Sequence, residues 1–298
     1  MIASARRRTT SRRDLERNPH FLRLSPAPGE LDTAALDSMV DEDPGTALTV
    51  LTEATGAVDP RLRELARRLA GRVIVRLTEN RLRSSGERGT GKIVLGRAGT
   101  EGDVDLDASL DAIADAKAAG RPVSLEDLAV RRWARPRSAI AVVVDRSGSM
   151  GGDRLANAAL AASVVAMRAP GDHAVLAFAG DVTVVKGIDE DATIERVVDD
   201  LLSLRGHGST DLALALYAAR AQLARSSASR RIAVVLSDCR HNCGGEPLTE
   251  ARWFDQMLVV APAGDSEEAR AFAASCGAKV AEVAGPTAIP ETLVQLLA

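Results

Sequence analysis

From residue 128 onward the chain alternates short apolar runs, rich in β-branched residues, with alanine-rich segments of helical periodicity. The apolar runs predict strands at 138–145, 173–180, 181–187, 231–238, 255–264 and 278–285. Helices are expected at 153–168, 190–203, 210–225, 266–276 and 290–298. Continuous apolar strands separated by helices indicate a parallel sheet covered on both faces. The runs at 173 and 181 are too close for a crossover helix, so they predict a hairpin and one antiparallel edge.

The first part of the chain follows a different pattern. Between residues 31 and 80 apolar positions recur every three or four residues, which predicts helices. Farther on, "DLDASLDAIADAKAAG" predicts a helix closed by Gly120. The stretch "DLAVRRWARPR" alternates enough to predict an edge strand beside the first strand of the sheet.

These patterns predict three regions. The first is a basic, disordered tail, because residues 1–24 are arginine-rich and show no periodicity. The second is a mainly helical region over 25–130, with a glycine-rich loop at 86–102, which we expect to pack onto the sheet. The third, over 131–298, is a doubly wound α/β domain with a mostly parallel six-stranded sheet.

Composition narrows the function classes for this chain of 298 residues. A net charge of −3 and an aromatic content of 2% argue against a protein that coats or stacks on nucleic acid. No run approaches the roughly 20 apolar residues that cross a bilayer, and no export signal is evident, so we expect a cytoplasmic location without membrane contact. The 3 cysteines leave one unpaired in any disulfide scheme, which favours reduced thiols.

The stretch "SSGERGTGKI", residues 84–93, comes close to a nucleotide-binding P-loop. Such a loop follows a buried strand and opens a helix, whereas here a polar segment precedes Gly86 and a strand-like run follows Lys92. Ile93 also stands where a hydroxyl should hold the Mg²⁺ ion. We therefore interpret this stretch as a surface loop and keep an ATPase using residues 86–92 as an alternative.

A cluster of oxygen-bearing side chains follows the strands of the predicted sheet. Functional groups gather at the carboxyl ends of strands in open parallel sheets, and "VVVDRSGSM" places Asp145, Ser147 and Ser149 just past the first strand. Thr210 in "GHGSTD" and Asp238 in "VVLSDC" could reach the same centre. Carboxylate and hydroxyl oxygens suit a hard cation, either Mg²⁺ or Mn²⁺. The competing interpretation is a turn whose serines only cap the next helix.

This five-residue pattern resembles the metal-ion-dependent adhesion site of von Willebrand factor A domains. The resemblance covers about residues 131–298 and implies direct ion binding by Ser147 and Ser149. It implies that Thr210 binds directly or through water, and that Asp145 and Asp238 bind mostly through waters. One coordination position would then stay open for a carboxylate from a protein partner.

Several neighbours of these residues are candidates for a partner-binding rim. Arg146 and Asp211 flank predicted ion ligands, and His207 lies in the threonine loop. Cys239 and His241 directly follow the aspartate after the fourth strand. Local ion pairing at the surface is the competing interpretation for Arg146 and Asp211.

The stretch "DCRHNC" also allows a different chemistry. Cys239, His241 and Cys243 could bind zinc, with His207 nearby, or the cysteines could be redox-active. The spacing C-x-H-x-C matches no standard zinc pattern, so a zinc hydrolase remains an alternative.

Within the family, "RPRSAIAVVVDRSGSM" and "GDVDLDASLDAI" resemble bacterial cytoplasmic members that accompany MoxR-type AAA+ ATPases, including CoxE-like proteins and the magnesium-chelatase D subunit. The resemblance implies a non-enzymatic adaptor that docks onto an ATPase or its client through the bound ion. We find no glutamate or histidine arranged as a general base, which argues against metal-assisted hydrolysis. An extracellular adhesin is a further alternative, which the missing export signal disfavours.

Overall fold

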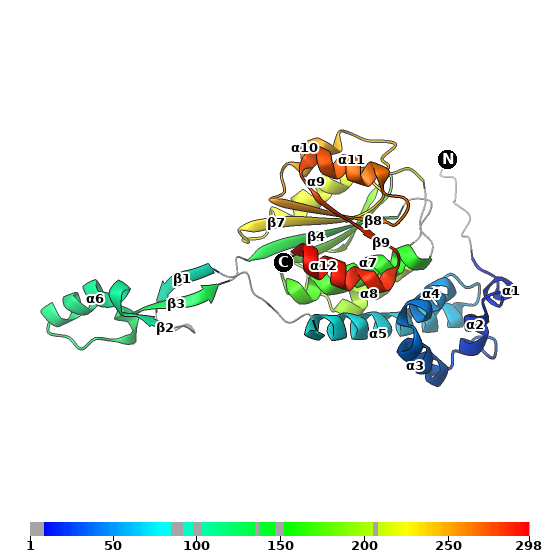
Figure 1. Cartoon of the computed structure of the whole chain (residues 1–298), viewed down its shortest axis with the longest axis horizontal. Helices are drawn as coiled ribbons and strands as arrows, with labels where there is room; N and C mark the ends of the chain where they lie inside the picture. The colour runs from blue at the N-terminus through cyan, green and yellow to red at the C-terminus, as the bar shows by residue number, and fades with distance from the viewer. Residues whose placement is uncertain are drawn as a thin grey trace. The chain divides into compact units, whose positions relative to one another are not determined.

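The chain forms two compact units. The computed structural model describes residues 9–84, 92–97, 103–134, 137–146, 152–204 and 208–297. One unit, which we call the sheet unit, combines Met1–Gly86 with Ser138–Leu297, and the other, the insertion unit, spans Glu87–Arg137 (Figure 1). The predicted helical region over 25–130 is therefore divided between them.

The sheet unit contains the predicted six-stranded sheet. Its strands are β4 (Ser138–Asp145), β5 (His173–Phe178), β6 (Val182–Lys186), β7 (Arg230–Leu236), β8 (Gln256–Pro262) and β9 (Lys279–Val283). Their spatial order is β6-β5-β4-β7-β8-β9, and every pair is parallel except β5 with β6. The fold class predicted from the sequence, including its single antiparallel edge, is confirmed.

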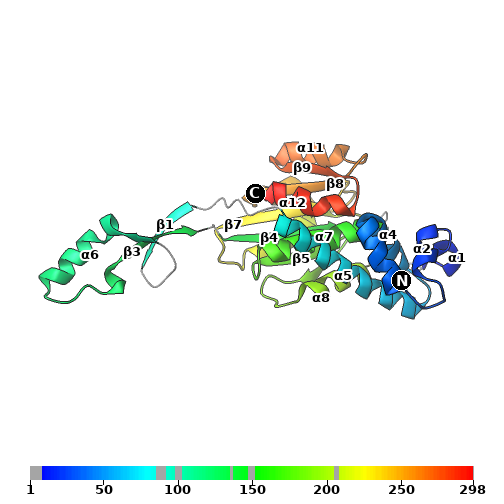
Figure 2. The ribbon, with the colours of Figure 1, turned by 60° about the horizontal axis from the view of Figure 1, so that its bottom comes forward.

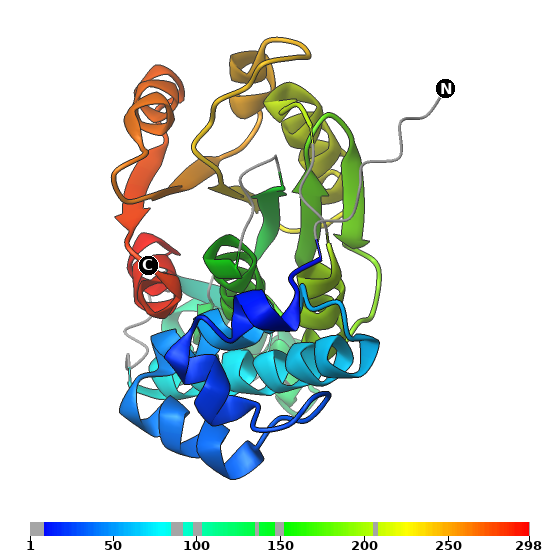
Figure 3. The same cartoon turned by 90° about the vertical axis from the view of Figure 1, so that its right-hand side faces the viewer.

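Helices cover both faces of this sheet (Figures 2 and 3). They are α7 (Gly152–Arg168), α8 (Ile194–Ser203), α9 (Leu212–Leu223), α10 (Pro247–Ala251), α11 (Glu267–Cys276) and α12 (Ile289–Leu297). Successive side chains of a strand point to opposite faces, so Val142 and Val144 of β4 join the core with α7, α8 and α12. Ala141 and Val143 join the core with α9, α10 and α11. The two-sided burial explains why the strands are apolar throughout.

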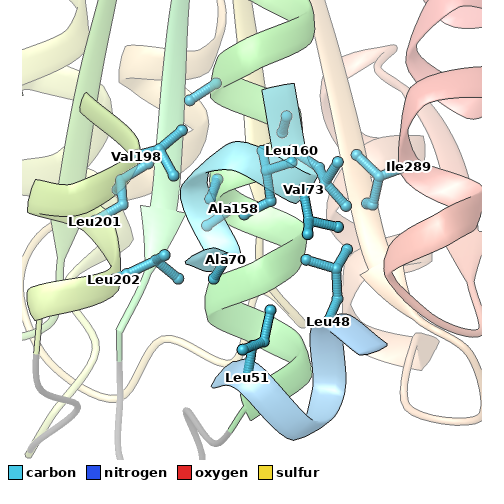
Figure 4. Close-up of a cluster of buried hydrophobic side chains, with 14 of the residues drawn as sticks. Leu48, Leu51, Ala70, Val73, Ala158, Leu160, Val198, Leu201, Leu202 and Ile289 are labelled. Atoms are coloured by element: carbon cyan, nitrogen blue, oxygen red, sulfur yellow. The ribbon is translucent and has the colours of Figure 1, made fainter. Parts of the chain in front are cut away.

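The N-terminal helices add a further layer to one face. They are α1 (Arg12–Leu15), α2 (Pro19–Leu24), α3 (Thr33–Glu42), α4 (Pro44–Ala54) and α5 (Pro60–Ser84). Figure 4 shows Val73 of α5 between Leu160 of α7 and Leu48 of α4, with Leu51 of α4 farther along, and all four belong to one buried cluster. The expected packing of this helical region onto the sheet is confirmed for residues up to 84.

The prediction of a disordered tail over 1–24 is wrong for the residues described, which begin at residue 9. The side chains of Phe21 and Leu24 in α2 are fully buried, and the Arg12 guanidinium donates hydrogen bonds to the carbonyl oxygens of Ser25 and Ala27. Two helices this short carry too few apolar positions to show a period, so the burial was invisible in the sequence. Residues 1–8 lie outside the described residues.

The insertion unit has a small antiparallel sheet of its own. It contains β1 (Lys92–Arg97), β2 (Asp103–Asp105), α6 (Leu106–Ala118), a 3-10 turn (Leu125–Asp127) and β3 (Ala129–Ala134). The strand order is β1-β3-β2. The stretch at 129–134 was predicted to extend the large sheet beside β4, and this prediction is wrong. Strand β4 is central, with β5 and β7 on its two sides, so it offers no edge for pairing.

Candidate metal-binding site

Two aspartates meet at the carboxyl edge of the large sheet. Asp145 is the last residue of β4, and Asp238 follows the end of the neighbouring parallel strand β7. Because parallel strands end at the same edge, the carboxylates are brought to one place, and both side chains are buried. Asp145 and Asp238 border the same small cavity.

A serine that the sequence analysis did not single out supports this pair. The Ser237 hydroxyl donates a 2.7 Å hydrogen bond to Oδ2 of Asp145 and accepts one of 2.9 Å from the backbone N–H of Cys239. Oδ1 of Asp238 accepts a 3.0 Å hydrogen bond from the backbone N–H of Arg240. One oxygen of each carboxylate is therefore oriented by a fixed donor. In the sequence, the only hint of this supporting role is that a serine directly precedes the aspartate in "VVLSDC".

Thr210 reaches the same edge through a second pair of loops. Its backbone N–H donates to Oδ1 of Asn242 at 2.9 Å, and the N–H of Asn242 donates to the Thr210 carbonyl at 3.1 Å. The backbone N–H of Asp211 donates to the carbonyl of Ala179, which follows β5. Thr210 is buried and is held between the loops after β5 and β7. Asn242, which clamps it, was also missed by the sequence analysis.

The carboxylate of Asp211 caps the N-terminus of helix α9. It caps α9 by accepting a 2.8 Å hydrogen bond from the backbone N–H of Leu214. Gly244, at φ +89°, passes so close that a Cβ there would overlap this carboxylate. The position therefore requires glycine both for its backbone conformation and for space. This contact fixes the loop after β7 against the first turn of α9.

Arg146 is anchored to the hairpin of β5 and β6. Its side chain is buried, and its guanidinium lies 2.6 Å from Oδ1 of Asp181 and 3.5 Å from the hydroxyl of Thr183. Its backbone N–H donates to the carbonyl of Phe178 at 2.8 Å. Local pairing, the competing interpretation for Arg146, therefore describes the side chain in this structure.

The cysteine loop does not form a metal cluster. Cys239 is buried, and this burial, with the nearby Asp238 and Asp145 carboxylates, raises the pKa of its thiol to about 12. His241 is exposed and Cys243 is half-buried. In the part of the chain that the structure describes, no three His, Cys, Asp or Glu side chains gather closely enough to hold a metal ion. A buried, protonated thiol is also a poor nucleophile.

The other predicted site residues, Ser147, Ser149 and His207, lie outside the described residues. The described donors are two carboxylates and one hydroxyl, which are the oxygen ligands that Mg²⁺ and Mn²⁺ prefer. The donor set present therefore fits a hard divalent cation.

A small cavity of about 30 Å³ adjoins the two aspartates. This volume holds a water molecule, and water molecules complete the coordination of ions that keep part of their hydration shell. The buried Oδ1 of Asn157, on α7, also borders the cavity and has no hydrogen-bond partner among the described residues. Ser237 also lines the cavity, and the rest of its wall is apolar and comes from several elements: Val144, Leu236, Val260, Pro262, Val283 and Ile289.

None of the helices over the described residues is long and apolar enough to cross a membrane. Among proteins with curated descriptions, no sequence matches this chain.

Several solved structures are similar to this chain. A von Willebrand factor type A protein from Catenulispora acidiphila is 16% identical, with a TM-score of 0.46, over 56% of this chain and 43% of that one. The manganese-loaded TRAP protein of Plasmodium vivax is 15% identical, with a TM-score of 0.42, over 52% and 71%. An aerotolerance-related membrane protein from Bacteroides fragilis is 17% identical, with a TM-score of 0.43, over 54% and 98%.

The part of the chain that matches a known family model includes the strands and loops that form the candidate site. Residues 140–241, which run from β4 to the loop after β7, match the family model of the von Willebrand factor type A domain. Together with the observed strand order, this match shows that the sheet unit has a von Willebrand factor type A-like α/β fold.

Proposed function

We propose that the chain is a non-enzymatic, Mg²⁺- or Mn²⁺-dependent protein-binding module. Asp145, Thr210 and Asp238 would hold the ion together with Ser147 and Ser149 of the D-x-S-x-S motif. The bound ion would supply a Lewis-acidic position for a carboxylate on the partner protein.

The observation that carries this proposal is the pairing of two buried aspartates at one sheet edge. Both carboxylates lie at the carboxyl edge of the sheet and border the same small cavity. Ser237 and the backbone N–H of Arg240 supply one hydrogen bond each to Asp145 and Asp238. Carboxylate oxygens held in this way are suited to bind a hard divalent cation.

The sequence resemblance to MoxR-associated proteins narrows the partner. We propose that it is a MoxR-type AAA+ ATPase or the client of such an ATPase, in complex remodelling, maturation or cofactor insertion. The location would then be the cytoplasm. The exposed His241 and the loop at 239–246 would contact the partner at the rim.

No described feature favours the enzymatic alternatives. Lys92, the lysine of the P-loop-like stretch, begins strand β1 and not a helix. A phosphate-binding lysine sits at the N-terminus of a helix, where the helix dipole also acts. Residues 85–91 lie outside the described residues.

The test begins with the ion itself. Mn²⁺ binding, followed by electron paramagnetic resonance and calorimetry, should show one site in the wild type, weakened at least about tenfold in Asp145→Ala. Asp191→Ala, which removes an exposed aspartate away from the site, is the matched control and should bind as the wild type does. Circular dichroism checks that each variant is folded.

The second step concerns the partner. Proteins captured from native lysate by wild type, Asp145→Ala and Asp191→Ala, in Mg²⁺ and in EDTA, are identified by mass spectrometry. An AAA+ ATPase or its client held by the wild type and by Asp191→Ala only in Mg²⁺, and not by Asp145→Ala, would support the adaptor function. Ion binding that survives Asp145→Ala, or the same partners in every sample, would refute it.

A further inference from the structure

The insertion unit exposes an unusual share of its large apolar side chains. Leu106, Leu110 and Leu125 are 66%, 59% and 71% exposed. Among the side chains described in this unit, the buried apolar ones are only Ala116 and Val130. A group of exposed leucines on a small unit marks a surface that another molecule covers.

The leucines on α6 form a defined stripe. Leu106 and Leu110 are one helical turn apart and therefore lie on the same side of the helix. Ser109 and Ala116, on the adjoining side, are buried against the unit. The stripe thus borders the anchored face of α6.

Specific bonds set the orientation of α6. Asp105 caps the helix by accepting a 3.2 Å hydrogen bond from the backbone N–H of Ala108, and its Oδ2 accepts one of 2.6 Å from Arg131. The Ser109 hydroxyl accepts a 2.8 Å hydrogen bond from the N–H of Ala129 in β3. The helix is therefore locked to the sheet of the unit, which presents the leucine stripe in a fixed direction.

The opposite border of the stripe is acidic. Asp107, Asp111 and Asp115 follow each other at intervals of four residues, and all three are exposed. The hydrogen-bonded ion pair of Arg121 goes to Asp127, at 2.7 and 2.8 Å. Arg131 pairs with Asp105, and Arg121 also interacts electrostatically with Asp115 at the end of the row, so Asp107 and Asp111 make up its outer part. The row therefore gives the leucine stripe a negative edge.

We propose that this face of α6 docks into an apolar groove, rimmed by lysine or arginine, on a partner protein. Leu106 and Leu110 would enter the groove, and the aspartate row would meet the basic rim and fix the orientation of the helix. This docking surface is separate from the ion site and needs no metal. It therefore goes beyond the function proposed above and stands or falls independently of it.

The test uses the full chain with four variants. Leu106→Ser/Leu110→Ser removes the stripe, and Asp107→Asn/Asp111→Asn removes the charge while keeping the shape. Leu22→Ser, at a leucine that is 49% exposed in the sheet unit, is the matched control. Asp145→Ala, with EDTA, separates this surface from the ion site. Proteins captured from native lysate are identified, and each candidate is then purified and titrated against each chain at low and high salt.

We expect a purified partner that binds wild type, Leu22→Ser and Asp145→Ala equally, with or without EDTA. Its affinity should fall at least about tenfold for Leu106→Ser/Leu110→Ser and several-fold for Asp107→Asn/Asp111→Asn, and high salt should weaken it. Hydrogen exchange in α6 verifies that both variants keep the helix.

Three results would overturn the proposal. One is that no protein distinguishes the wild type from Leu106→Ser/Leu110→Ser. Another is self-association of the chain, seen by sedimentation, that the leucine variant abolishes, since the occupant would then be a second copy. The third is leucine-dependent binding to phospholipid vesicles, which would make the surface a membrane contact.

Discussion

The sheet unit and the insertion unit use leucine in opposite ways. Leu160 of α7 is fully buried between the sheet and the N-terminal helices, whereas Leu106 of α6 is 66% exposed. Both side chains lie on helices that pack against a sheet (Figure 1). The sheet unit has layers on both faces that remove most of its leucines from water, whereas in the described part of the insertion unit one α-helix packs on a three-stranded sheet. The apolar residues of a unit are therefore buried only where the unit has enough layers of secondary structure to cover them.

The largest effect should come from Leu160→Ala. Removing a fully buried leucine loses its transfer free energy and leaves a cavity, which lowers the free energy of unfolding by about 3 kcal/mol. Urea denaturation of the whole chain measures it. A loss below about 1 kcal/mol would mean that this core is loosely packed and would weaken the contrast between the units.

The second prediction is that the free energy of unfolding of the sheet unit depends on pH through His173. Burial, followed by the nearby positive charge of Lys186, lowers the pKa of His173 to about 4, and its Nδ1 donates to the carbonyl of Ala169. In the unfolded chain histidine titrates near 6.5, so protons bind the unfolded state first as the pH falls from 6.5 towards 4. The contribution of His173 to the free energy of unfolding is therefore fully present above pH 6.5. It should fall by about 2 kcal/mol between pH 7 and pH 5.

Chemical denaturation at the two pH values, with His173→Gln as the comparison, measures this linkage. The variant should lose less stability than the wild type over the same interval. An equal loss in both proteins would show that His173 is not the group responsible.

The third prediction turns to the insertion unit. Asp105→Ala removes both the cap of α6 and the partner of Arg131, so amide exchange in α6 should become about tenfold faster. Amides of β4 and β7 should keep their exchange rates, because they belong to the other compact unit. Faster exchange in both places would show that the units unfold together and would remove the distinction between them.

The smallest effect should come from Leu110→Ala. This leucine is 59% exposed, so its truncation should change the free energy of unfolding by less than about 0.5 kcal/mol. The same denaturation assay as for Leu160→Ala measures it. A cost comparable to that of Leu160→Ala would mean that Leu110 is part of a core, and the proposed docking face would lose its basis.

The strands of the large sheet were largely readable from the sequence, since predicted strand 138–145 coincides with β4 and the others differ by at most two residues at either end. The placing of Asp145 and Asp238 at one edge followed from the same pattern, because strand direction determines where the loops meet. The supporting contacts of Ser237 and Asn242 could not be predicted in this way. Each depends on which loops come within hydrogen-bonding distance across about 32 to 92 residues of chain.

By itself, the sequence determined the α/β alternation, the antiparallel edge and the residue types at the candidate site. Periodicity and strand-end chemistry are local properties of the chain, and they are strong where a strand is buried on both faces. Only the tertiary structure decided that residues 12–24 are packed helices, that 129–134 belongs to a separate sheet, and that the leucines of α6 are exposed. Burial and strand pairing are properties of surfaces brought together from distant parts of the chain, and a linear pattern does not record which surfaces meet.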